Sequence, residues 1–145
     1  MEFSTKQLGN LTELQCATYL YSLSCPISIP FGNSEKYDLI MDYNYTLYKI
    51  QCKHSSEILD EQGRVCAIKF KTTWQGHNSS GWTRHQYNIN EVDFFATFYD
   101  NKCYLVPCYQ CSNEKTLRIL PPKNGQIKGV SFLKDYEASE VLKTL

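Results

Sequence analysis

Apolar and polar residues alternate along the segment "YDLIMDYNYTLYKIQCK", residues 37–53. This period of two predicts a pair of β-strands, which a two-residue turn at "NY" joins into a hairpin. In this register Tyr48, Ile50 and Cys52 share one face of the sheet and form its apolar side. A longer turn would shift the register and send these residues to the other face.

The same register gathers the polar residues of the hairpin on its other face. Asp38 lies opposite Gln51, and Lys53 follows two residues later on the same side of the strand. A carboxylate beside an amide oxygen and a main-chain carbonyl is an oxygen site of the kind that Mg²⁺ accepts. A neighbouring ammonium can orient or acidify metal-bound water, which suits phosphodiester hydrolysis. The alternative is an ion pair between Asp38 and Lys53 on a solvated sheet surface, which contributes about 0–1 kcal/mol.

Helical periodicity is clearest near the N-terminus, in "STKQLGNLTELQCATYLYSLS", residues 4–24. Ser4 is a candidate N-cap with Gln7 as its capping-box partner, although the following Gly-Asn pair would also permit a later start, near Thr12. The residues expected on its core-facing stripe are Leu11, Leu14, Ala17 and Tyr21, with Glu13 beside them.

Strand patterns dominate the rest of the chain and are expected at residues 25–32, 64–74, 92–100, 102–110 and from 116 into a loop that contains Pro and Gly. A polar loop is expected at residues 75–88 and a terminal helix at 133–145. One helix, several strands and a late helix predict a mixed α+β fold, with a central mixed β-sheet flanked by helices. The length of 145 residues suits one domain over residues 1–145.

Composition limits the class of protein. The 15 basic and 15 acidic side chains give a formal net charge of zero, so any basic surface depends on an uneven distribution of charge. Seven Cys without a tight framework argue against a secreted disulfide protein, and the N-terminus lacks the pattern of a signal peptide. No apolar run approaches the length of a membrane span. We therefore expect a soluble, intracellular protein, in the cytoplasm or nucleoid or in an organelle, with no membrane partner.

Cys103, Cys108 and Cys111 raise the question of a zinc site. Structural zinc usually takes paired, short-spaced ligands, and here the sequence has neither a second Cys-x-x-Cys nor a nearby His. Scattered structural thiols are the better interpretation, so no zinc is expected.

Charge is unevenly distributed between Glu61 and Glu91, where no acidic residue occurs. The basic residues of this window are Arg64, Lys69, Lys71 and Arg84, together with His77 and His85. Basic side chains neutralise phosphates, while amides and Arg forks contact base edges, so a ribbon in this window could enter a major groove. A second candidate DNA-binding segment is "RILPPKNGQ", with Arg118, Lys123, Asn124 and Gln126. Each segment could also be an ordinary polar loop.

The order of these motifs is similar to that of the PD-(D/E)XK nuclease superfamily, which uses an early helical Glu, an Asp at the start of a hairpin and an acid-x-Lys on the next strand. Glu13, "YDLI" and "IQCK" occupy those places. The phrases "IPFGNSEKYDLIMD", "YKIQCK", "DFFATFYDNKCYLVP" and "LRILPPKNGQIKGV" most resemble the small group I intron homing endonucleases of this superfamily. Archaeal Holliday-junction resolvases are more distant. The resemblance implies a restriction-endonuclease-like core.

The resemblance also implies a role for each site residue. Asp38 would bridge the metal, Glu13 would assist metal or water binding, and Lys53 would be the catalytic lysine. The main-chain carbonyl of Cys52 would be a further metal ligand. Gln51 stands where most of the superfamily has an acid, as it does in the homing endonucleases that the chain resembles, and its neutral oxygen should lower metal affinity. Mg²⁺ is the expected ion, and Mn²⁺ should be able to replace it.

One active site cuts one strand of a duplex, so a double-strand break needs at least a homodimer of this chain. The resembled homing endonucleases form tetramers, which makes a tetramer the other expectation. The sequence thus favours a Mg²⁺-dependent, site-specific DNA endonuclease that leaves a 5′-phosphate. A junction resolvase or repair nuclease and a non-catalytic DNA-binding protein of the same fold are the alternatives.

Overall fold

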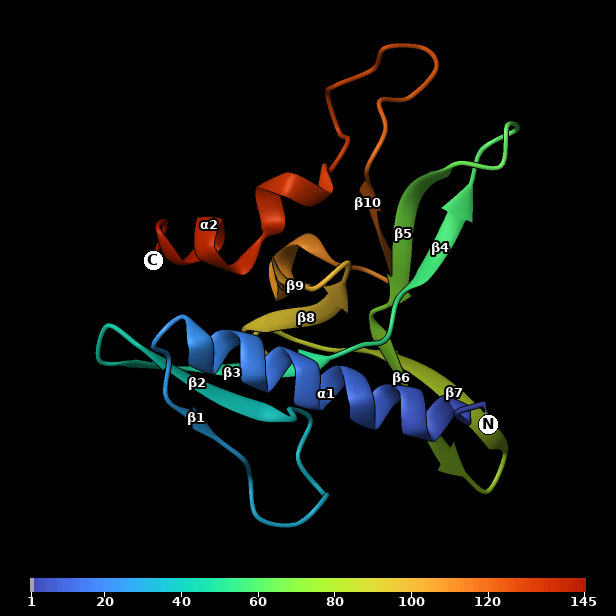
Figure 1. Cartoon of the computed structure of the whole chain (residues 1–145). Coiled ribbons are helices and arrows are strands. Elements are labelled where there is room, and N and C mark those ends of the chain that lie inside the picture. The colour runs from blue at the N-terminus through green and yellow to red at the C-terminus, as the bar shows by residue number, and fades with distance from the viewer. Residues whose placement is uncertain (1) are drawn as a thin grey trace.

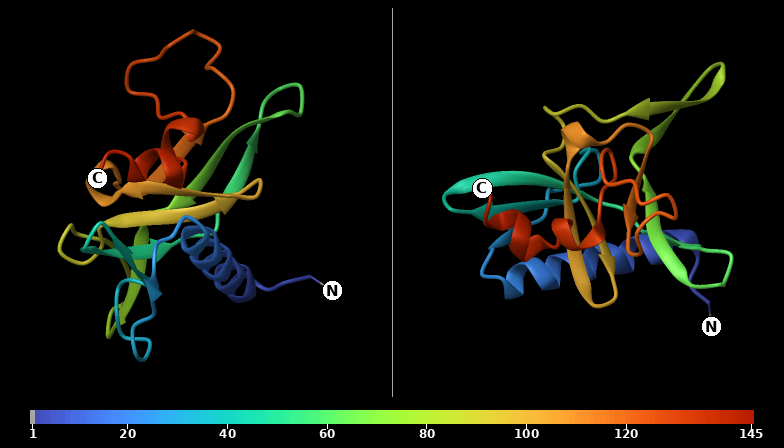
Figure 2. Two further views of the ribbon diagram at one scale, coloured as in Figure 1. Left: turned by 60° about the vertical axis from the view of Figure 1, so that its left-hand side comes forward. Right: turned by 90° about the horizontal axis from the view of Figure 1, so that it is seen from above.

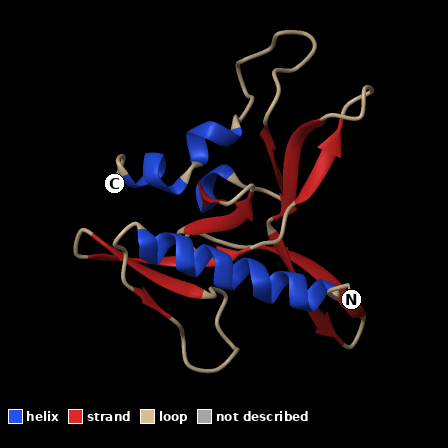
Figure 3. Ribbon diagram, in the orientation of Figure 1, coloured by secondary structure: helices blue, strands red, loops and turns tan. Residues whose placement is uncertain are grey.

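The computed structural model describes residues 2–145, except for the side chain of Asn78, and more of the chain lies in β-strands than in helices (Figures 1 and 3). The helices are α1 (Thr5–Ser22) and α2 (Ala138–Leu142), and two 3₁₀ helices span Cys108–Gln110 and Leu133–Tyr136. The strands are β1 (Ile27–Ser28), β2 (Leu39–Tyr43), β3 (Thr46–Cys52), β4 (Ser56–Leu59), β5 (Val65–Lys71), β6 (Thr73–Asn78), β7 (Gly81–Gln86), β8 (Phe94–Tyr99), β9 (Lys102–Pro107) and β10 (Glu114–Arg118).

A five-stranded sheet in the order β1-β2-β3-β8-β9 forms the centre of the fold. Its strands are antiparallel to their neighbours except β3 and β8, which run parallel, so the sheet is mixed. Strands β4, β5 and β10 form a second sheet, and β6 with β7 forms a two-stranded ribbon. Together with the helices α1 and α2, the mixed central sheet confirms the predicted α+β class.

The hairpin at residues 37–53 has the register that a two-residue turn predicts. Tyr43 pairs with Thr46, and the two turn residues, Asn44 and Tyr45, both have a positive φ, of 55° and 66°. A turn with positive φ at both central positions matches the right-handed twist of the strands that it joins. The turn therefore fixes which residues of the hairpin share a face.

Helix α1 begins at the predicted cap. The Ser4 amide donates to Oε1 of Gln7 at 2.8 Å, and the Gln7 amide donates to Oγ of Ser4 at 3.2 Å. This reciprocal pair satisfies two amides that a helix N-terminus would leave without partners, so the helix starts at Thr5 rather than near Thr12.

The predicted core-facing stripe of α1 was wrong at two of its four residues, while Ala17 does pack against the core. Leu14 and Tyr21 are 65% and 69% exposed, and the buried residues of the helix are Thr12, Cys16 and Leu20. Thr12 and Cys16 are small, so the helix can lie close to the sheet along this face. The sequence argument ranked positions by hydrophobicity and therefore selected a neighbouring stripe.

The core consists of two clusters of buried residues on opposite faces of the central sheet. The first, beside α1 and α2, includes Leu20, Met41, Ile50, Phe94 and Leu105. The second, beside β5 and β10, includes Ile68, Phe70, Phe95, Val106 and Leu117. Because Phe94 and Phe95 are adjacent on β8 and belong to different clusters, β8 is buried on both faces.

Three further expectations need correction. The strand expected at residues 64–74 is interrupted at Thr72, whose amide and hydroxyl donate to the carbonyls of Asn113 and Ser112, both at 3.0 Å. The loop expected at residues 75–88 is instead the β6–β7 ribbon. Figure 2 shows, in its right-hand view, that this ribbon and α1 lie on opposite sides of the central sheet.

The expected terminal helix, residues 133–145, is divided between a 3₁₀ helix and α2. Glu137 separates them because its extended backbone forms a β-bridge with Tyr104. Strand β4, which pairs with β5, was not predicted. Among the described residues, no helix combines the length and apolar character that a membrane crossing needs.

Candidate active site

The polar residues of the β2–β3 hairpin lie where the hairpin opens away from its turn. Asp38 precedes β2, and its amide donates to the Ile50 carbonyl at 2.8 Å. Lys53 follows β3, and its amide donates to the Ala96 carbonyl of β8 at 2.8 Å. Since Leu39 pairs with Ile50, the register extended by one residue places Asp38 opposite Gln51.

The Asp38 carboxylate is fixed by the main chain. Its Oδ2 accepts a hydrogen bond from the Cys52 amide at 2.9 Å. Burial raises the pKa of Asp38 above its ordinary value, and the Cys52 amide and the Lys53 charge offset this effect only in part. The structure therefore holds the carboxylate in place at the cost of part of its hydration.

The Lys53 ammonium is held by a carbonyl rather than by a carboxylate. Its Nζ donates to the main-chain oxygen of Thr73, at the start of β6, at 3.1 Å, and lies 5.2 Å from the centre of the Tyr87 ring. Burial lowers the pKa of Lys53, against the opposing effect of the Asp38 charge. No carboxylate in residues 2–145 lies within 4.0 Å of this ammonium, which argues against the surface ion pair with Asp38.

Glu13 reaches the same region from α1. Its carboxyl is partly buried, and burial followed by the charge of Asp38 raises its pKa. A hydrogen bond with Cys16 and burial raise the pKa of the Cys52 thiol well above its ordinary value, and the charges of Asp38 and Glu13 add to this effect. Two carboxylates thus repel each other beside the end of β3, and a bound cation would relieve that repulsion.

The donor set suits a hard divalent ion. In the part of the chain that the structure describes, no group of three or more His, Cys, Asp and Glu side chains is placed to hold a metal. Gln51 lies opposite Asp38 in the extended register, and Cys52 donates its amide to Asp38, so both can offer neutral oxygens at this end of the hairpin. Mg²⁺ is bound in this way by one or two carboxylates, because it keeps several of its waters.

Buried thiols line the core behind the carboxylates. Cys16, Cys52 and Cys103 belong to the first core cluster, and a hydrogen bond with Cys103 together with burial raises the pKa of Cys16 well above its ordinary value. Cys108 and Cys111 pack in the second cluster, on the other face of the sheet. The three cysteines considered for zinc are therefore divided between two clusters and do not form one ligand set.

The β6–β7 ribbon presents two different faces. Gln75 pairs with Arg84, and His77 pairs with Trp82, which places these four exposed side chains on what we call the open face. Trp74 pairs with His85 on the other face, which we call the anchored face. There the rings stack with centroids 4.3 Å apart and planes inclined by 23°.

The residues between Glu61 and Glu91 that were predicted to bind DNA therefore differ in how accessible they are. Arg84 is exposed on the open face, whereas His85 is engaged by Trp74. Lys69 and Lys71 lie on one face of β5, with Lys69 half-buried and Lys71 exposed opposite Glu114. Sequence reasoning missed Gln75, because its place opposite Arg84 is visible only once the ribbon register is known. It also missed the Thr73 carbonyl, because a main-chain atom leaves no trace in residue type.

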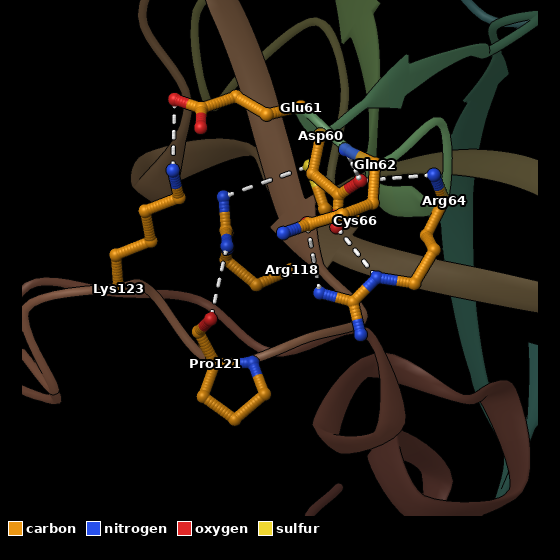
Figure 4. Close-up of polar contacts among 8 residues, drawn as sticks. All are labelled: Asp60, Glu61, Gln62, Arg64, Cys66, Arg118, Pro121 and Lys123. Carbon is orange, nitrogen blue, oxygen red and sulfur yellow. Dashed lines mark hydrogen bonds and ion pairs between the residues drawn. The ribbon is translucent and has the colours of Figure 1, made fainter.

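The second predicted segment packs against the β4–β5 turn (Figure 4). Nε of Arg118 donates to the Leu120 carbonyl at 3.0 Å, and Nη2 donates to the Pro121 carbonyl at 3.3 Å. The guanidinium therefore stabilises the conformation of the loop that follows it. Lys123 pairs with Glu61 at 2.8 Å, and both side chains are largely exposed. The other two residues of the segment, Asn124 and Gln126, bind each other. The main-chain N–H of Gln126 donates to Oδ1 of Asn124 at 3.0 Å.

A mixed sheet with paired carboxylates and a lysine at the open end of a hairpin is the arrangement of a metal-dependent nuclease. A family model described as PD-(D/E)XK endonuclease matches residues 3–139, and the chain belongs to this family. Nucleases of this family generally use divalent metal ions, and their fold implies a DNA substrate. No curated protein shows significant sequence similarity to the chain.

A solved structure is similar over almost the whole chain. It is that of a bacterial homing endonuclease, I-Ssp6803I, with a TM-score of 0.75 and 19% sequence identity. The match covers 98% of this chain and 95% of the other. At this level of identity the likeness establishes the fold, and it confirms both the restriction-endonuclease-like core and the resemblance on which it was predicted.

Proposed function

We propose that the chain is a Mg²⁺-dependent, site-specific DNA endonuclease of the homing type, and that residues 1–145 form one endonuclease domain. The observation that carries the proposal is the position of Asp38, Gln51 and Lys53 together at the open end of one hairpin, with Glu13 from α1 beside them. These residues come from α1 and from both arms of the hairpin. A hairpin with a purely structural role would not require charged side chains at this end.

Each site residue has a distinct task in this proposal. Asp38, Glu13, the Gln51 amide and the Cys52 carbonyl would hold Mg²⁺, which would supply an acidified water and offset charge on the phosphate. The Lys53 ammonium offsets the negative charge that develops on the phosphate oxygens. Because burial lowers the pKa of Lys53, this residue exchanges a proton more readily near neutral pH than an exposed lysine would.

The open face of the ribbon is the part of the surface best suited to base contacts. Gln75 and Arg84 lie directly opposite each other, so their Cβ atoms are about 5 Å apart. An amide side chain pairs with adenine and a guanidinium with guanine in the major groove. Lys69, Lys71 and Lys123 contact phosphates, and Asn124 and Gln126 contribute from the loop after β10. His85 supports the ribbon through its stack on Trp74, and Arg118 holds the loop after β10 in place.

A double-strand break requires two such sites facing opposite strands. We propose that the chain acts as a homo-oligomer, a dimer or a tetramer, on a nearly symmetric target.

Cleavage by the purified protein tests the proposed function. With Mg²⁺, the wild type should cut duplex DNA that contains its target and leave a 5′-phosphate, and Mn²⁺ should replace Mg²⁺. Lys53→Ala and Asp38→Asn should each reduce cutting by about 100-fold or more, while DNA binding survives. Equal cutting by the wild type and both variants would rule out this site.

The choice of DNA substrate separates the related activities. Cleavage of four-way junctions without regard to sequence would instead indicate a resolvase-like or repair nuclease. Binding to DNA without cleavage of any substrate would indicate a non-catalytic DNA-binding protein of the same fold.

A further inference from the structure

The first residues of β6 connect the ribbon to the candidate active site. The carbonyl that holds the Lys53 ammonium belongs to Thr73, a buried residue at the root of the ribbon. The next residue, Trp74, is on the anchored face. Any movement of the ribbon root therefore moves the oxygen that binds Lys53.

Trp74 is held by two charged or polar side chains. Nζ of Lys36 lies 3.3 Å from the centre of the indole ring, which is the geometry of a close cation–π contact. His85 stacks on the same indole at 4.3 Å. Lys36 stands two residues before Asp38 in the chain, so the indole links the segment that carries the carboxylate to the strand that carries the Thr73 carbonyl.

Gly76 permits this close packing. A Cβ atom at this position would lie 3.1 Å from the Trp74 ring and 3.2 Å from Nε2 of His85. These distances are shorter than ordinary van der Waals contacts, so a larger residue would push the two rings apart. Nε1 of Trp74 is buried and makes no hydrogen bond within the described residues. The contacts of Trp74 with Lys36 and His85 are therefore made by the face of the indole ring and not by its N–H group.

The ribbon has attachments besides Trp74. The amide of Thr72 and the side chain of Gln86 both bind Asn113 and tie the ribbon to the segment before β10. After β7, Tyr87 packs edge-on against Phe95 of the second core cluster. Loss of the Trp74 contacts should thus leave the ribbon attached while its first carbonyl moves relative to Lys53.

We propose that Trp74 is a positioning residue: clamped by Lys36 and His85, it fixes the Thr73 carbonyl so that the Lys53 ammonium is held beside Asp38. Its consequence for cleavage rests on the proposed function. The positioning of Lys53 itself does not, and can be measured without DNA or metal.

The reactivity of Lys53 toward acetic anhydride, followed by mass spectrometry, measures this positioning directly. The exposed Lys128 provides an internal reference. At a pH high enough to deprotonate both amines, Lys53 of the wild type should react slowly, because its side chain is half-buried and bound to the Thr73 carbonyl. Trp74→Leu should increase the relative labelling of Lys53 by about fivefold, since the released amine becomes accessible. Trp74→Phe, which keeps an aromatic face for Lys36, should restore most of the protection.

Trp82→Leu is the matched control, because Trp82 is the other tryptophan of the ribbon and lies on its open face, 71% exposed. It should leave Lys53 labelling unchanged. If Trp74→Leu does not fold, Lys36→Met tests the same clamp without altering the ribbon and should raise labelling by about twofold. Unchanged labelling in a folded Trp74→Leu or Lys36→Met protein would overturn the proposal.

Cleavage then connects the positioning to function. At saturating DNA and Mg²⁺, Trp74→Leu should slow single-turnover cutting by about tenfold or more, with DNA affinity changed much less. If Trp74→Leu changes the labelling of Lys53 but the wild type cuts no DNA, the positioning role stands and the nuclease function is rejected. If the wild type cuts DNA but Trp74→Leu leaves the labelling of Lys53 unchanged, the nuclease function stands and the positioning role of Trp74 is rejected.

Discussion

The β2–β3 hairpin and the β6–β7 ribbon are both antiparallel pairs, but they are stabilised in different ways. The hairpin buries Met41 and Ile50 completely in the first core cluster, and its polar residues stand at its open end. The ribbon exposes most of its side chains and is held chiefly at its root. On this basis we propose a division of labour, in which the buried hairpin carries the reacting groups and the more weakly held ribbon contacts the substrate.

Removing one large side chain from each pair should show the difference most strongly. Ile50→Ala removes a fully buried side chain, so the free energy of unfolding should fall by about 2–5 kcal/mol. Trp82→Ala on the open face of the ribbon should change it by about 0.5 kcal/mol or less. Urea unfolding followed by circular dichroism measures both values. A loss in Trp82→Ala comparable to that in Ile50→Ala would contradict the proposed difference in packing.

The ribbon should dominate sequence discrimination. Arg84→Ala should weaken binding to the cognate target by about 1–3 kcal/mol and relax the preference at one base pair. Lys71→Ala should weaken binding to cognate and scrambled duplexes alike and reduce its salt dependence. Equilibrium binding at several salt concentrations distinguishes the two results. Equal losses on both duplexes for Arg84→Ala would place its guanidinium on phosphate rather than on a base.

The Asp38 carboxylate should cost stability when no metal is bound. The pKa of Asp38 is raised in the folded state, so the folded protein binds more protons than the unfolded chain, and stability rises as pH falls through this window. Above the folded pKa the buried charge opposes folding. Asp38→Asn should therefore raise the melting temperature of the metal-free protein at pH 7, although it abolishes cutting.

Metal addition provides the converse measurement. Mg²⁺ should raise the melting temperature of the wild type by binding the folded state, and should have little effect on Asp38→Asn. A metal-free Asp38→Asn protein that melts below the wild type would show that the carboxylate stabilises the hairpin, contrary to the repulsion inferred at this end of it.

The two pairs also differ in how far the sequence predicts them. The hairpin follows from alternation and a turn that accepts positive φ, so the register and the grouping of Asp38, Gln51 and Lys53 could be derived residue by residue. The ribbon has polar residues on both faces, so it lacks the alternation that would mark it as a pair of strands. The clamp of Lys36 on Trp74 joins distant segments, and no local pattern encodes it.

The smallest expected effect concerns the loop after β10, which packs against the β4–β5 turn, away from the ribbon. Lys123 is paired with Glu61 on the surface, and an exposed pair of this kind contributes little to stability. Glu61→Gln should therefore leave the melting temperature almost unchanged but free the ammonium for a phosphate, so DNA affinity should rise a little, and Lys123→Ala should lower it on any duplex. If neither substitution changes affinity, the loop lies outside the interface. DNA would then contact the ribbon without it, and the contrast between a catalytic hairpin and a recognising ribbon would become sharper.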